Sequence, residues 1–63
     1  MDINWSIAIL EAEMVCRNLH KSNDILSALE CIKQFSAEEL YSMSKFKADE
    51  IDRIVNYWRG YNV

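Results

Sequence analysis

The spacing of apolar side chains along residues 3–19 predicts a long helix with two separate apolar faces. At about 100° per residue, a broad face and a narrow face are divided by two ridges of polar side chains. A surface helix of a small domain usually buries one apolar face, so a second face requires a second partner. The broad face holds Trp5, Ala8, Ile9, Ala12, Val15, Cys16 and Leu19, and the narrow face holds Ile3, Ile7, Leu10 and Met14.

The narrow face has the spacing of the seam between paired helices, because its members lie 4, 3 and 4 residues apart. We expect it to contact a second copy of the chain, which makes the protein a homodimer through its first helix. The broad face is then left for the next helix of the same chain, and Ala8 and Ala12 allow that helix to approach closely. The predicted dimer interface is Ile3, Ile7, Leu10 and Met14.

Three further helices follow from local signals. Residues 24–35 have a single apolar face, made by Ile25, Ala28, Leu29, Ile32 and Phe35, and residues 20–23 separate them from the first helix. Ser36 and Glu39 have the spacing of a capping box, which predicts a short helix over residues 37–43. A turn in which Phe46 fills the core leads to a last helix over residues 48–59, whose core side chains include Trp58.

The composition favours an all-α fold and association. With one glycine and no proline among 63 residues, the chain offers little turn chemistry for β-hairpins. We expect one domain over residues 1–63, a small bundle of three longer helices and one short helix. A chain of this length buries only roughly 60% of its unfolded surface, and its 51% apolar residues favour stabilisation by association.

Charge and hydropathy restrict the classes of partner. The net charge of −3 favours protein partners over the broad basic surface that phosphate backbones require. No run of about 18 apolar residues is present, so we expect a cytoplasmic protein without a membrane span. No small-molecule substrate is expected either.

Neither a metal site nor a catalytic site is predicted. Cys16 and Cys31 lie in helical patterns without a secretory leader, and we expect reduced core thiols at similar heights in a helical hairpin. Together with His20 they lack the paired spacing of zinc modules. The single histidine has no nucleophile and orienting group beside it, so we expect no enzyme activity and no cofactor.

Two features of the last third of the chain suggest binding. Tyr57, Arg59 and Tyr61 form an aromatic and basic cluster of the kind enriched at protein interfaces, and we predict that they bind a partner protein. The alternative is a dimeric DNA-binding regulator with a helix-turn-helix over residues 37–57. Its reading helix would expose Asp49 and Asp52 to phosphates, which opposes that alternative.

The opening Asp2-Ile3-Asn4-Trp5, the ending Tyr57-Trp58-Arg59-Gly60-Tyr61 and the length give the whole chain a family likeness. It resembles the small early accessory proteins of lambdoid temperate bacteriophages, from the short reading frames between the recombination and excision genes. The resemblance implies a helical, dimeric protein that affects the choice between lysis and lysogeny or the host cell cycle. The hypothesis is therefore a non-enzymatic phage protein that binds a bacterial host protein in the host cytoplasm.

Overall fold

The computed structural model describes residues 2–16 and 22–59, and the regular structure in these two ranges is helical throughout. The elements are α1 (Ile3–Cys16), α2 (Ser22–Lys33), α3 (Ala37–Met43) and α4 (Ala48–Arg59). The all-α prediction is confirmed. The predicted bounds of α3 and α4 agree with the structure, whereas α2 begins and ends two residues earlier than predicted. Residues 17–19 of the predicted first helix lie outside the described residues.

Side-chain caps hold the starts of α1 and α3. The Trp5 amide donates to the Asp2 carboxylate over 3.1 Å, which satisfies one of the free amides of the first turn. At α3 the Glu39 amide donates to Ser36 Oγ over 3.2 Å, and the Ser36 amide donates to Glu39 Oε1 over 2.8 Å. The predicted capping box is therefore confirmed.

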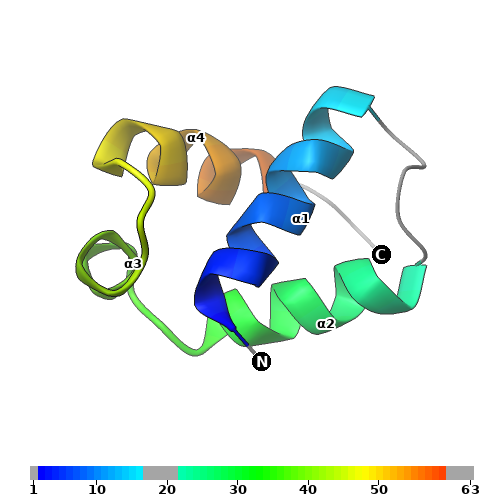
Figure 1. The fold of residues 1–63 in the computed structure, drawn as a ribbon, viewed down its shortest axis with the longest axis horizontal. Coiled ribbons are helices and arrows are strands. Elements are labelled where there is room, and N and C mark those ends of the chain that lie inside the picture. Colours follow the sequence, from blue (N-terminus) through cyan, green and yellow to red (C-terminus); the bar gives the residue numbers. More distant parts are fainter. Residues whose placement is uncertain (1, 17–21, 60–63) are drawn as a thin grey trace.

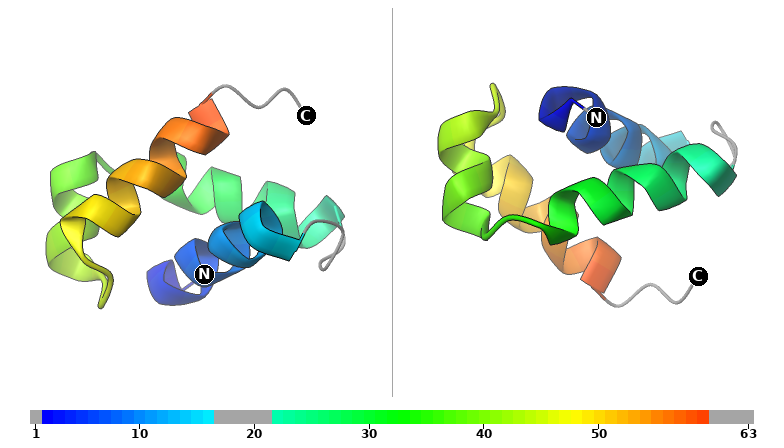
Figure 2. Two further views of the ribbon diagram at one scale, coloured as in Figure 1. Left: turned by 90° about the horizontal axis from the view of Figure 1, so that it is seen from above. Right: turned by 90° about the horizontal axis from the view of Figure 1, so that it is seen from below.

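Helix α1 is the central element of the arrangement. It lies against both α2 and α4, and α3 lies at one end of the molecule, between α2 and α4 (Figures 1 and 2). Two polar contacts tie α1 to the second half of the chain. Asn4 Oδ1 accepts from the Lys45 amide over 2.8 Å, and Glu11 pairs with Arg53 over 3.0 Å. In the described ranges α2 and α4 do not pack closely against each other.

The core gathers side chains from all four helices. The Trp58 indole is 5% exposed, and its Nε1–H donates to the Leu10 carbonyl over 3.2 Å, so α4 is fastened to the backbone of α1. The predicted core roles of Trp58 and Phe46 are confirmed, since Phe46 packs against this cluster. The buried apolar residues are Ile7, Ile9, Leu10, Ile25, Ala28, Cys31, Leu40, Ile51, Ile54 and Trp58.

The predicted dimer face lies inside the subunit, so its assignment to a second copy is wrong. Ile7 and Leu10 are 2% and 0% exposed, and Ile3 and Met14 are half-buried and pack against the same core. The physical reason is that the second partner of α1 is α4 of the same chain. A narrow seam with regular spacing suits an intramolecular neighbour as well as it suits another copy.

The predicted broad face of α1 is mostly turned outward. Val15 is 74% exposed and Trp5 38%, and Ala8 is exposed as well, so this face does not hold α2 as expected. A polar residue, Ser6, faces inward instead. Ser6 is fully buried, and its hydroxyl donates to the Asp2 carbonyl over 3.0 Å, which removes the cost of burying it.

The two cysteines lie at opposite ends of the α1–α2 hairpin, which contradicts the prediction of similar heights. Cys16 is the exposed last residue of α1, whereas Cys31 is buried and lines a surface pocket with Ile3 at the start of α1. In an antiparallel hairpin with a short link, the end of α1 faces the start of α2. Cys31 is near the end of α2 and therefore faces the start of α1. The prediction of a core thiol is confirmed for Cys31 and wrong for Cys16.

Candidate functional site

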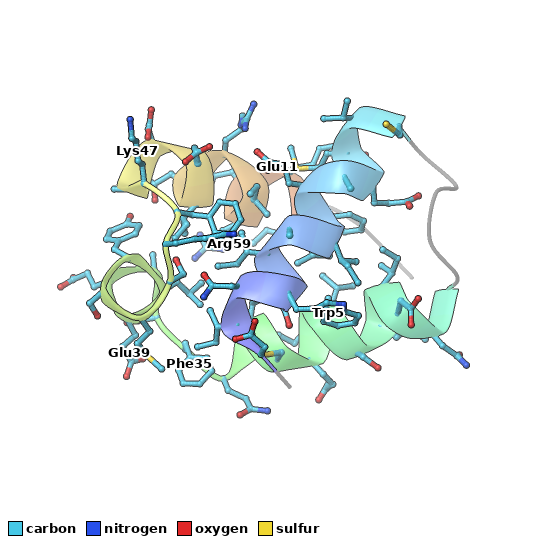
Figure 3. The ribbon with its side chains drawn as sticks, in the orientation of Figure 1. Trp5, Glu11, Phe35, Glu39, Lys47 and Arg59 are labelled. Carbon is cyan, nitrogen blue, oxygen red and sulfur yellow. The ribbon has the colours of Figure 1, made fainter. Side chains whose placement is uncertain are left out.

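A groove opens where α2, α3 and α4 meet, on the side where α2 and α4 do not pack closely. Its volume is about 280 Å³. Phe35 lies just after the end of α2, and Arg59 is the last residue of α4 (Figure 3). The groove is therefore formed by the carboxyl-terminal ends of two helices and by α3. The lining residues are Leu29, Ile32, Lys33, Phe35, Ser36, Ala37, Leu40, Val55, Trp58 and Arg59.

The interior of the groove is apolar and firmly held. Trp58 and Leu40 are 5% and 2% exposed, so only small parts of them are open to the groove. The Trp58 ring is positioned by its bond to the Leu10 carbonyl and by the Tyr57 ring, which meets it edge-to-face at 5.2 Å. Because the indole N–H is already bonded, the ring offers apolar contact to anything that enters.

The charged side chains of the groove are both cations. Lys33 and Arg59 lie in the last turns of α2 and α4 and are exposed, and the lining includes no aspartate or glutamate. Within the part of the chain that the structure describes, neither forms an ion pair, in contrast to Arg53 with Glu11. A chain with net charge −3 thus has a locally basic rim around an apolar groove.

Two of the three residues predicted to bind a partner are described by the structure, and they have different surroundings. Arg59 lines the groove and is exposed. Tyr57 is half-buried and packs against the core and the Trp58 ring, so it mainly supports the groove from behind. Tyr61 lies outside the described residues. The sequence pattern missed Lys33, since this residue lines the same groove as Arg59 only once α2 and α4 have packed against α1.

The helix-turn-helix candidate has the expected core but an unsuitable outer face. Leu40, Ile51 and Ile54 are buried. The Tyr41 hydroxyl donates to the Asp52 carboxylate, a bond that raises the pKa of Tyr41 above its ordinary value. The exposed Arg53 is paired with Glu11, so the presumed reading face presents carboxylates and one neutralised cation.

The two cysteines do not form a common metal site. Cys16 and Cys31 are separated by the length of α1, and His20 lies outside the described residues. Among residues 2–16 and 22–59, no group of three or more histidine, cysteine or acidic side chains is placed to hold a metal ion.

A second apolar surface lies on the outer side of α1. It consists of Trp5, Ala8, Ala12 and Val15, and we call it the outer face of α1.

No helix within the described residues is long and apolar enough to cross a membrane.

Comparisons with protein-family models, with curated proteins and with solved structures find no match to this chain. Function is therefore inferred from the groove, its charges and the outer face of α1.

Proposed function

We propose that the protein is a non-enzymatic accessory factor that works by contact, occupying a surface of a bacterial protein. The observation that carries this proposal is the groove, in which a fixed tryptophan ring lies beside two exposed cations without an ion pair among the described residues. Tryptophan and arginine are among the residues most enriched at binding hot spots, where a buried anchor is surrounded by polar contacts. The resemblance to early phage proteins supplies the bacterial cytoplasm as the expected setting.

The homodimer belongs to this proposal through a different surface. Ile7 and Leu10 are buried in the subunit. A dimer that forms through α1 would therefore use the outer face of this helix. The small Ala8 and Ala12 allow two helices to approach, and Val15 is the most exposed large apolar side chain of that face. Sedimentation of the Val15→Lys variant should give a monomer, and an unchanged dimer would exclude this face.

Affinity capture tests the contact function. The tagged chain is used to retain proteins from a bacterial lysate, with and without nuclease, and the bound proteins are identified by mass spectrometry. We expect a host protein that persists after nuclease treatment. The Lys33→Glu, Arg59→Glu double variant should lose it, because the groove then carries carboxylates in place of both cations.

A matched double variant controls for net charge. Lys45→Glu with Lys47→Glu introduces the same change of charge just before α4, at the opposite end of that helix from Arg59, about 18 Å away along its axis. It should retain the host protein as well as the wild-type chain does. Equal retention of the host protein by both double variants would show that the groove does not bind it.

A DNA-binding regulator is the second candidate, favoured by the buried helix-turn-helix core of Leu40, Ile51 and Ile54. Phosphate contacts weaken steeply as salt rises, so DNA affinity measured over a salt series distinguishes the two. Loss of all captured material on nuclease treatment, together with a steep salt dependence, would favour this candidate.

A further inference from the structure

We propose that the groove between α2, α3 and α4 takes an acidic segment of another protein, which inserts a bulky apolar side chain against Trp58. Carboxylates of this segment pair with Lys33 and Arg59. The inference rests on the proposed contact function and adds the chemistry of the partner.

The shape of the groove favours an inserted side chain over a small organic ligand. Its volume of about 280 Å³ is at the lower limit of ligand pockets, which begin at about 300 Å³. Most of its lining is aliphatic or aromatic, and the indole N–H of the buried Trp58 is already bonded to Leu10. Such a site favours apolar contact with the Trp58 ring.

The charges select the sign of the partner. One cation stands on α2 and the other on α4, so carboxylates on either side of an inserted side chain each meet a cation. A basic segment would meet repulsion from both Lys33 and Arg59. A neutral segment would bury apolar area but leave both cations without a new partner.

The acidic remainder of the chain does not cancel this preference. Charges beyond about 8 Å are largely screened at physiological ionic strength, and Asp52 lies about 10 Å before Arg59 along α4. Glu30, Glu38 and Glu39 are nearer to the groove in the chain, but none of them lines it. The lining itself therefore carries two cations and no carboxylate, within a chain of net charge −3.

A second copy of the chain is a poorer occupant. A symmetric contact through the groove would place Lys33 and Arg59 of one copy opposite the same two cations of the other. The phosphate backbone of a nucleic acid would meet only two cations and has no side chain to fill the apolar interior. A different protein with an acidic and apolar segment satisfies both parts of the groove.

Selection from a random peptide library tests the chemistry without assuming a partner sequence. Displayed peptides of random sequence are selected on the wild-type chain, and the tightest are synthesised with a fluorescent label for anisotropy. We expect the enriched peptides to combine aspartate or glutamate with tryptophan, phenylalanine or leucine. Enrichment without acidic residues would overturn the proposal.

Charge reversal then assigns the binding to the groove. The Lys33→Glu, Arg59→Glu variant should weaken an acidic peptide by about tenfold or more, and a peptide with lysine in place of its acids should prefer that variant. The Lys45→Glu, Lys47→Glu variant should bind the acidic peptide within about twofold of wild type. The four side chains are exposed, and circular dichroism confirms that both variants fold.

The remaining outcomes identify other occupants. Unchanged peptide affinity in the groove variant would overturn the proposal, and so would a change of oligomeric state in that variant alone, which would assign the groove to a second copy. Tighter peptide binding on removal of residues 60–63 would show that the chain's own end competes for the groove and would support its use as a docking site. A captured host protein with no acidic preference among peptides leaves the contact function standing and removes only this inference.

Discussion

Helix α4 is amphipathic and could be oriented from its sequence, whereas α1 is apolar on more than one side and could not. In α4 the buried side chains are Ile51, Ile54 and Trp58, on one face, and the charged residues lie on the other. In α1 apolar side chains surround much of the helix, and the face that is buried is not the broadest one. A helix with one apolar face can be placed from its own residues, whereas a helix with two faces is placed by competition among its neighbours.

The competition at α1 is decided by fit and by hydrogen bonding. Ser6 is small, and its hydroxyl bonds the Asp2 carbonyl, so a ridge counted as polar can be buried at little cost. The neighbouring Leu10 offers its carbonyl to Trp58, a contact that no pattern of apolar spacing contains. Ser6 and Leu10 lie on the inner side of α1, and Trp5 and Val15 lie on its outer side.

The largest expected effect comes from reversing the polarity of the two faces of α1. Leu10→Lys should abolish the fold, since an unpaired ammonium costs several kcal/mol in the interior and a small domain has only about 3–5 kcal/mol of stability. Val15→Lys should keep the wild-type helical spectrum in circular dichroism at low protein concentration, where association does not contribute. A folded Leu10→Lys chain would mean that the inner face of α1 is assigned wrongly.

A smaller loss of stability is expected from a change at the hydrogen bond between Trp58 of α4 and Leu10 of α1. Trp58→Phe keeps an aromatic ring but removes the N–H donor to Leu10 and part of the buried volume, which should cost about 2 kcal/mol in urea unfolding. Trp5→Phe is the control on the outer face, and its cost should be below about 0.5 kcal/mol. Equal costs for the two substitutions would show that the indole hydrogen bond contributes nothing.

The start of α3 should contribute less again. Ser36→Ala removes the acceptor of the Glu39 amide and should lower the free energy of unfolding by about 1 kcal/mol. Ser42→Ala, an exposed serine later in the same helix, should change stability by less than about 0.5 kcal/mol. Thermal unfolding followed by circular dichroism makes both measurements.

The smallest effect concerns the outer face of α4. Asp52→Asn removes the carboxylate that raises the pKa of Tyr41, so this pKa should fall towards 10.0 in a titration of tyrosinate absorbance. Because the folded pKa is raised, the Tyr41–Asp52 bond stabilises the fold fully below the ordinary tyrosine pKa and is lost as pH rises through the folded value. Asp49→Asn serves as the control, and a fall of equal size there would assign the shift to net charge.

The bounds and the faces of single helices such as α4 could be predicted from the sequence, but the groove could not. Residue-specific signals such as the Ser36 and Glu39 box determine where α3 begins, and the single face of α4 determines its orientation. The groove depends on how far apart α2 and α4 lie, which follows from the packing of each against α1. Lys33 and Arg59 are far apart in the chain, so no local pattern could join them at one rim.

The bond between Trp58 and Leu10 also bears on how the protein is made. Its two residues are 48 positions apart. The inner face of α1 is therefore not covered by α4 until residues 48–59 have been synthesised. Until then the nascent protein exposes apolar surface on both sides of its first helix, the condition in which chains aggregate or are captured by chaperones. A ribosome that stalls before Trp58 therefore releases a product that cannot complete its core.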